Sequence, residues 1–161
     1  MKILLVVFIM LSSFLIGSGV KQKIKNEYSF LVYLKNFVVF LKSNFNMFKV
    51  DIVSIIDEYI KFQDDKNGKY NAIFQKNNEI YIINYRAVCD NNSNEEDKHT
   101  IYTFLNAMGK SNYEFEDEKI NSFLYFLQNK MKEYCDNIKE KGVLTEKIML
   151  AVGLIISILV W

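Results

Sequence analysis

Apolar residues recur in alternating steps of four and three along residues 120–138, a period that predicts an amphipathic α-helix. They form a seam of the kind that is buried against another helix, made of Ile120, Leu124, Leu127, Met131, Tyr134 and Ile138. Ahead of this seam, Ser111 lies three residues before Glu114, which is the spacing of a capping box. Gly109 is suited to end the preceding helix. The sequence therefore predicts a turn near 109–111 and a long helix over 112–141.

Three earlier stretches also carry a helical period. Residues 28–48 repeat apolar side chains at steps of three and four, at Leu31, Leu34, Val38, Leu41, Phe45 and Phe48. Asp51 is placed to cap a second helix, whose apolar stripe is Ile52, Ile55, Ile56, Tyr59 and Ile60. Three acidic residues then open a short helix at 95–97, with an inner face of Ile101, Phe104, Leu105 and Met108. Residues 21–142 are therefore expected to form a helical domain.

The stretch 70–92 has no clear period. Its segment 79–85 is β-branched and aromatic, so its intrinsic preference is for a strand. A lone strand has nothing to pair with, and no second strand-like run follows it. We therefore expect this segment to be helical, and the predicted fold class is all-α.

A long apolar run lies near the start of the chain, from Ile3 to Val20. Two interpretations fit it. A basic start, an apolar run and the small residues Gly17 and Gly19 are typical of a cleaved signal peptide. An uncleaved membrane anchor over 1–20 is favoured, because lysines follow at once at 21, 23 and 25 and the run is long enough to span a bilayer.

A second apolar run, from Ile148 to Trp161, has lysines before it at 139, 141 and 147, and it needs Val143 and Leu144 to be long enough for a membrane span, which is therefore expected from Val143 to Trp161. Both runs thus carry their lysines on the side of the central region. Short basic flanks prefer the cytoplasm, so the simplest topology is a hairpin with both chain ends outside and the central domain in the cytoplasm. A buried core helix is the alternative for 143–161, and the lack of any charge after Lys147 favours the membrane span.

The chain offers little chemistry. Twenty basic and 19 acidic residues give no electrostatic argument for nucleic acid. His99 is the single histidine and falls on the polar face of a short helix, and the distant Cys89 and Cys135 have no metal-binding spacing and are expected to be free thiols. Phosphate-binding and nucleophile motifs are missing. We expect no enzyme activity, cofactor or metal.

One set of residues in the last third of the chain forms a recognisable pattern: Phe104, Met108, Gly109, Ser111, Asn112, Glu116, Ile120, Leu127, Gly153 and Leu154. In this pattern the chain resembles the stage III sporulation protein AB family. The resemblance runs without a gap from Phe104 to Trp161, and departs from the family where Met108 replaces a usual Leu, Asn112 an Asp and Glu116 a Gln.

This resemblance implies a membrane component of the assembly that links a mother cell to its forespore. The family's helical domain is similar to that of inner-membrane platform proteins of type II secretion and type IV pilus systems. The implied partners are other membrane subunits, a cytoplasmic secretion-type ATPase and a second copy of the chain, with the domain in the mother-cell cytoplasm. Two alternatives remain: a surface protein with a cleaved signal peptide and a C-terminal anchor, and a generic membrane-tethered adaptor.

One surface is a candidate for partner contact. Charged residues of the 112–141 helix lie outside its seam, at Lys130, Lys132, Glu133 and Lys139. A solvated helix face is the simpler interpretation of the same pattern.

Overall fold

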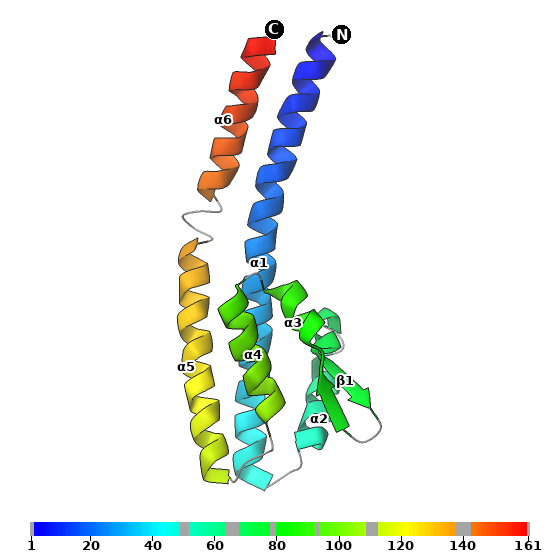
Figure 1. The fold of residues 1–161 in the computed structure, drawn as a ribbon, viewed down its shortest axis with the longest axis vertical. Coiled ribbons are helices and arrows are strands. Elements are labelled where there is room, and N and C mark those ends of the chain that lie inside the picture. The colour runs from blue at the N-terminus through cyan, green and yellow to red at the C-terminus, as the bar shows by residue number, and fades with distance from the viewer. Residues whose placement is uncertain are drawn as a thin grey trace. The chain divides into compact units, whose positions relative to one another are not determined.

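A computed structural model of the chain describes residues 2–48, 52–63, 68–77, 80–92, 94–108, 113–137 and 143–160. Within these ranges the fold is mostly helical, as predicted. The six α-helices are α1 (Lys2–Phe48), α2 (Ile52–Gln63), α3 (Tyr85–Asn91), α4 (Glu95–Ala107), α5 (Tyr113–Asn137) and α6 (Val143–Val160). A 3₁₀ helix, η1 (Gly68–Ile73), and two strands, β1 (Phe74–Asn77) and β2 (Ile80–Ile83), complete the order along the chain (Figure 1).

The strands correct the all-helical prediction. β1 and β2 pair antiparallel, with Phe74 opposite Ile83 and Asn77 opposite Ile80. The segment 79–85 was expected to be helical. This prediction was wrong, because residues 80–83 form the strand β2. The partner strand precedes β2 instead of following it, and its sequence, Phe-Gln-Lys-Asn, has only one residue of strong strand preference. The strand conformation of β1 therefore depends on its pairing with β2 and not on the intrinsic preference of its own residues.

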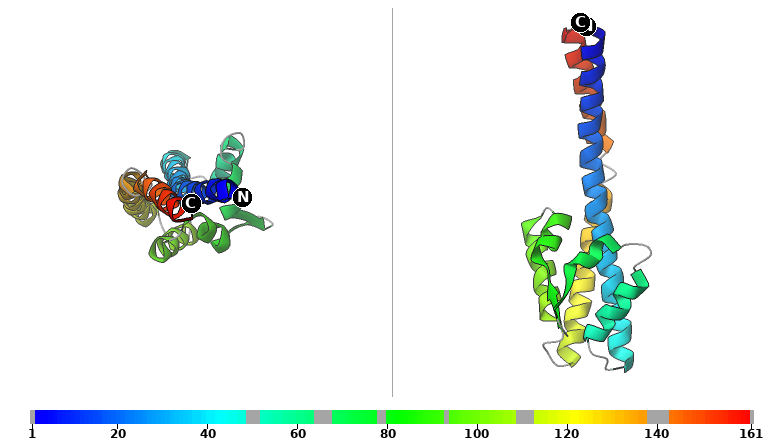
Figure 2. Two further views of the ribbon diagram at one scale, coloured as in Figure 1. Left: turned by 90° about the horizontal axis from the view of Figure 1, so that it is seen from above. Right: turned by 90° about the vertical axis from the view of Figure 1, so that its right-hand side faces the viewer.

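The chain forms two compact units. The first contains Met1–Tyr28 and Lys132–Trp161, and the second contains Ser29–Met131. In the first unit, α6 runs antiparallel to the first part of α1, so that the outer ends of the two helices lie together (Figures 1 and 2). α1 is one continuous helix, because the sequence between its apolar run and its second half contains neither glycine nor proline to interrupt it.

The core of the second unit is aromatic. The ring of Phe37 lies 4.8 Å from that of Phe74 and 5.2 Å from that of Tyr59, and Tyr33 lies 5.3 Å from Tyr70. The rings belong to α1, α2, η1 and β1, so one cluster joins four elements. Two buried or half-buried hydroxyls are satisfied: Tyr33 donates to Oδ1 of Asn71 at 2.9 Å and Tyr59 to the carbonyl of Tyr33 at 3.2 Å.

Most of the predicted helix faces are buried. On α1 the seam residues Leu31, Leu34, Val38 and Leu41 are buried, and on α2 so are Ile55, Ile56 and Tyr59. On α4, Ile101 and Leu105 are buried and Phe104 is half-buried, and Met108, which directly follows the helix, is also buried. The side chains of Phe45 and Phe48 and the residue Asp51 lie outside the described part.

The seam of α5 is shifted from the predicted one. Its buried positions are Glu116, Ile120, Phe123 and Leu127, whereas Leu124 is only half-buried. Both sets fit steps of three and four, so the period alone did not choose between Phe123 and Leu124. The predicted capping box at Ser111, the glycine at 109 and the seam residue Ile138 lie outside the described residues.

Asparagine side chains cap the N-termini of α3 and α4. Oδ1 of Asn84 accepts a hydrogen bond from the Ala87 amide at 3.2 Å, and Oδ1 of Asn94 accepts one from the Asp97 amide at 3.1 Å. The predicted acidic opening of the short helix is confirmed, since α4 begins at Glu95 with three acidic residues in its first turn.

Candidate functional site

In the first unit, α1 and α6 meet through small residues. Gly17, Gly153 and Ser157 are buried there. A Cβ atom built on Gly17 would lie 3.2 Å from Cα of Glu146, and one built on Gly153 would lie 2.8 Å from Oγ of Ser13. Only residues without a bulky side chain allow two helix backbones to come this close.

The large apolar side chains of the same two helices are exposed. On α1 they are Leu5, Val7, Phe8, Leu11, Phe14, Leu15, Ile16 and Val20; on α6 they are Leu144, Ile148, Val152, Leu154, Ile155, Ile156, Ile158 and Leu159. Burial is therefore inverted relative to a water-soluble helix pair, in which the large side chains would be covered. An apolar surface of this extent marks a region that contacts other apolar material.

Serines within these apolar runs bond to their own helices. The hydroxyls of Ser12 and Ser157 donate to the carbonyls four residues earlier, at 2.8 Å and 2.7 Å, and that of Ser18 donates to the carbonyl of Leu15 at 3.0 Å. These hydrogen bonds satisfy the hydroxyls without water, which is the arrangement that polar side chains need in lipid.

A salt bridge lies where both apolar runs end. Nζ of Lys21 lies 2.8 Å from Oε2 of Glu146. The contact fixes which residues of the two helices lie side by side, and both apolar runs extend from it in the same direction.

By length and composition, α1 is able to cross a membrane. Within Leu5–Asn44, the most apolar stretch has a mean hydropathy of 1.7 and is 6% buried, so it is not a covered core helix. Among the described residues α1 alone passes this test; α6, with 18 residues, does not.

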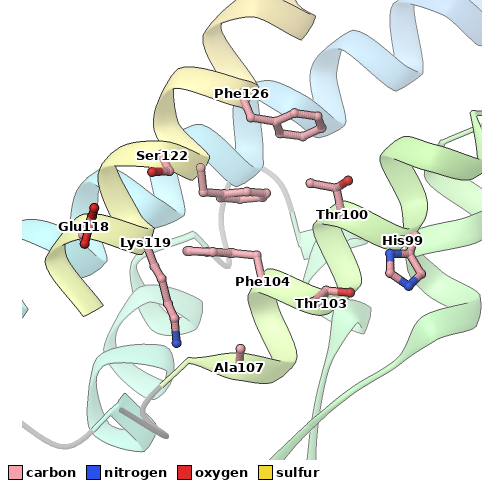
Figure 3. Close-up of a pocket in the computed structure, with 10 residues that line it drawn as sticks. His99, Thr100, Thr103, Phe104, Ala107, Glu118, Lys119, Ser122 and Phe126 are labelled. Carbon is pink, nitrogen blue, oxygen red and sulfur yellow. The ribbon is translucent and has the colours of Figure 1, made fainter. Parts of the chain in front are cut away.

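The second unit carries a groove of about 600 Å³ between α4 and α5. Phe104 of α4 and Phe123 of α5 both line it and stack on each other, with ring centroids 3.8 Å apart and planes 9° from parallel. The remaining lining residues are His99, Thr100, Thr103, Ala107, Glu118, Lys119, Ser122 and Phe126. The exposed His99 thus lines this groove, as Figure 3 shows. The surface of the groove is mostly apolar.

An ion pair joins the same two helices. Nζ of Lys130 lies 3.0 Å from Oδ1 of Asp97, whose side chain is 2% exposed. Lys130 therefore packs against α4 instead of standing on a solvated face, whereas Lys132 and Glu133 are exposed. Lys130 is therefore not part of an exposed partner surface of the kind predicted. Lys139 lies outside the described residues.

Little in the described ranges points to catalysis. No group of three or more His, Cys, Asp or Glu side chains there is arranged to hold a metal ion. Cys89 and Cys135 are both free thiols, as predicted, and both are half-buried.

The sequence model for stage III sporulation protein AB matches residues 2–161. This chain belongs to the stage III sporulation protein AB family. The match extends the resemblance seen in the last third of the sequence to nearly the whole chain, and it includes both α1 and α6. No curated protein and no solved structure shows a comparable match.

The family-motif residues fall into two groups in the structure. In the second unit, Met108, Glu116, Ile120 and Leu127 are buried and Phe104 lies in the ring stack, so these residues hold α4 and α5 in place. In the first unit, Gly153 is buried against α1 while Leu154 is exposed. Gly109, Ser111 and Asn112 lie outside the described part, as does Trp161. Of the predicted membrane boundaries, Val20 is exposed, and the side chains of Ile3 and Val143 are not described.

Sequence reasoning missed several residues of these sites. Phe123 and Phe126 of the groove and Ser13 at the helix contact were not singled out, and Lys130 was not identified as the partner of Asp97. Phe123 was detectable, because it lies three residues after Ile120 and four before Leu127. The contact of Ser13 with Gly153 joins residues far apart in the sequence, and no local pattern identifies such a pair.

Proposed function

We propose that this protein is a non-enzymatic membrane component of a sporulation assembly between mother cell and forespore, where it acts as an inner-membrane platform subunit. Residues 3–20 and 143–161 would be its two membrane spans. The observation that carries this proposal is the inverted burial of α1 and α6, in which glycine and serine are covered and the large apolar side chains are exposed.

This arrangement is energetically unfavourable in water but not in a lipid bilayer. Each exposed leucine, isoleucine or phenylalanine forfeits about 1.5–3 kcal/mol of burial in water. In a bilayer the same side chains face acyl chains, and helix association depends on close packing and hydrogen bonds instead of hydrophobic burial. The contact at Gly17 and Gly153 is a contact of that kind.

The proposed topology is a hairpin with both ends outside and the second unit in the mother-cell cytoplasm. Its support is the position of the lysines, at 21, 23 and 25 after the first run and at 139, 141 and 147 before the main part of the second. The proposed partners are the ones that the family resemblance implies, other membrane subunits of the assembly and a cytoplasmic secretion-type ATPase, together with a second copy of the chain.

Expression timing tests the sporulation role. We expect the gene to be silent in growth and switched on during sporulation, and we expect its disruption to lower the yield of heat-resistant spores. Equal expression in both phases together with normal spore yield would favour a generic membrane-tethered adaptor.

The mass of the mature N-terminus tests the two-span arrangement. An intact N-terminal segment, retained in membranes after an alkaline wash, is the expected result. Loss of about the first 19 residues would remove the part of α1 that contacts Gly153. The protein would then be a surface protein held by its C-terminal anchor alone.

A further inference from the structure

The groove of the second unit lies between two antiparallel helices. Phe104 of α4 stacks on Phe123 of α5. Seven residues earlier on α4, Asp97 pairs with Lys130, which lies seven residues later on α5. The residues that line the groove cover about two turns of each helix, or roughly 12 Å. The groove thus has the direction and the length of a short helical segment laid against α4 and α5.

Aromatic rings and short side chains line this groove. Phe104 and Phe126 are half-buried, and Figure 3 shows both side chains between the two helices. Thr100, Thr103 and Ala107 are the short side chains of α4 in the lining. Short side chains at a contact let another helix approach closely. An apolar groove of this kind is a recurring binding site for the apolar face of an amphipathic helix.

A carboxylate lies at each end of the groove. Glu118 is the first α5 residue of the lining, and Glu96 lies one turn before Thr100, whose hydroxyl donates to the Glu96 carbonyl. Because α4 and α5 are antiparallel, these two positions are at opposite ends. Both side chains are exposed, and neither forms an ion pair with any residue that the structure describes.

Basic side chains beside the groove do not offset this acidic charge. Lys98 and Lys130 are each paired with a carboxylate of α4, and Lys119, which lines the groove, has an interaction partner within the chain. Residues 95–107 and 113–131 together contain seven acidic and three basic residues, whereas the whole chain has a formal charge of +1. The two groove helices are therefore acidic within a nearly neutral protein, and this charge favours a basic occupant.

We propose that the groove binds an amphipathic helix of a partner protein. Apolar side chains of this helix, at steps of three and four residues, lie against the phenylalanine rings, and a lysine or arginine near each of its ends faces Glu96 or Glu118. This inference rests on the proposed function, since a platform subunit acts by holding other proteins, and it adds the surface and the chemistry of the partner. It does not depend on the two membrane spans.

The test measures binding of two synthetic amphipathic helices of about 16 residues to the full-length protein in a non-ionic detergent. Both peptides carry leucine at i, i+4 and i+7; one has lysine and the other glutamate in its first and last turns. Fluorescence anisotropy gives the affinities, with empty micelles as the blank. The wild-type protein is expected to bind the lysine peptide about fivefold more tightly than the glutamate peptide, because each exposed charge pair contributes roughly twofold. In E96K/E118K this order is expected to reverse.

A matched pair of variants separates the groove from the rest of α4. Thr103→Arg places a long side chain in the groove and should lower the affinity for the lysine peptide by about tenfold or more. Asn106→Arg adds the same charge at an exposed residue of α4 outside the lining and should stay within about twofold of the wild type. Circular dichroism checks that both variants are folded.

Four results would overturn the inference. These are no binding of either peptide, equal binding of both by the wild type, an affinity that Thr103→Arg leaves unchanged, and a wild-type dimer that Thr103→Arg dissociates, which would assign the groove to a second copy of the chain. None of these measurements involves sporulation. Normal spore yield after gene disruption would overturn the proposed function and leave the peptide result standing, so the two failures are distinguishable.

Discussion

Gly153 of α6 lies so close to Ser13 of α1 that a Cβ atom on Gly153 would be 2.8 Å from Oγ and 2.9 Å from Cβ of Ser13. Real Cβ atoms do not come this near to other heavy atoms, so any larger side chain at 153 must move the helices apart. Gly19 offers a matched position on α1, because a Cβ atom there meets nothing within 4 Å.

The first prediction concerns this contact. In a protein without its native cysteines, new cysteines at 17 and 149 should form a disulfide on mild oxidation, because a Cβ atom at 17 would lie 3.3 Å from Cβ of Met149, close to the separation that a disulfide requires. Adding Gly153→Leu should lower the yield of this disulfide severalfold, since the leucine separates α6 from α1. Adding Gly19→Leu should leave it unchanged. Equal yields in the two variants would show that the glycine contact does not hold the helices together.

The second prediction concerns the ion pair of α4 and α5. Lys130→Met should lower the free energy of unfolding by about 3 kcal/mol, because it leaves the buried carboxylate of Asp97 without its cation. The double variant D97N/K130M should recover a large part of this loss, since it removes the buried charge as well. Chemical denaturation of the full-length protein in detergent measures both effects.

The matched control for Lys130 is Lys132→Met, two residues further along α5 and exposed. This change should stay within about 0.5 kcal/mol of the wild type. If Lys130→Met is as mild as the control, the pair with Asp97 does not stabilise the fold.

The third prediction is a pH dependence. Burial, and then a hydrogen bond to Asp57, raise the pKa of Tyr81 to about 12, from an ordinary value near 10. The folded protein thus favours the neutral phenol. The stabilisation from this group should be complete below pH 10, the range of an unfolded tyrosine, and should be lost as the pH rises towards 12.

Carbon NMR of labelled tyrosine rings follows this titration. One resonance should titrate near pH 12 and should be missing from the spectrum of Tyr81→Phe. In Asp57→Asn its midpoint should move down, because the negative charge that opposes ionisation is removed. A Tyr81 resonance that titrates near 10 would contradict the hydrogen bond to Asp57.

The fourth prediction concerns the ring stack in the groove. Phe123→Ala should lower the free energy of unfolding by about 3 kcal/mol, because it removes a buried ring that stacks on Phe104. Tyr125→Ala, on the exposed side of α5, should change it by less than about 0.5 kcal/mol. Similar losses in the two variants would mean that α5 is turned differently from the arrangement in Figure 3.

Much of the helical fold could be predicted from the sequence, because the period of apolar residues follows directly from helix geometry. The buried faces of α1 and α2 matched their predicted stripes, and the acidic opening of α4 marked its first residue. The phase of the α5 seam was harder, since Phe123 and Leu124 both fit the period. Only the contact of Phe123 with Phe104 on another helix decides between them.

The β-hairpin could not be predicted for a different reason. β2 has strong strand preference, but its partner β1 gains its conformation from pairing and from the packing of Phe74 against Phe37. The same holds for the small residues of α1 and α6. The sequence indicates two apolar runs, but it does not show that Gly153 lies against Ser13.

The most direct test of the account is the side of the membrane on which the second unit lies. A single cysteine at Asn129, an exposed position of α5, is placed in a protein whose native cysteines are replaced by serine. A membrane-impermeant thiol reagent is then applied to intact and to permeabilised cells. Labelling only after permeabilisation is the predicted result and places the domain in the cytoplasm, whereas labelling of intact cells would contradict the hairpin and favour the cleaved, surface-exposed form.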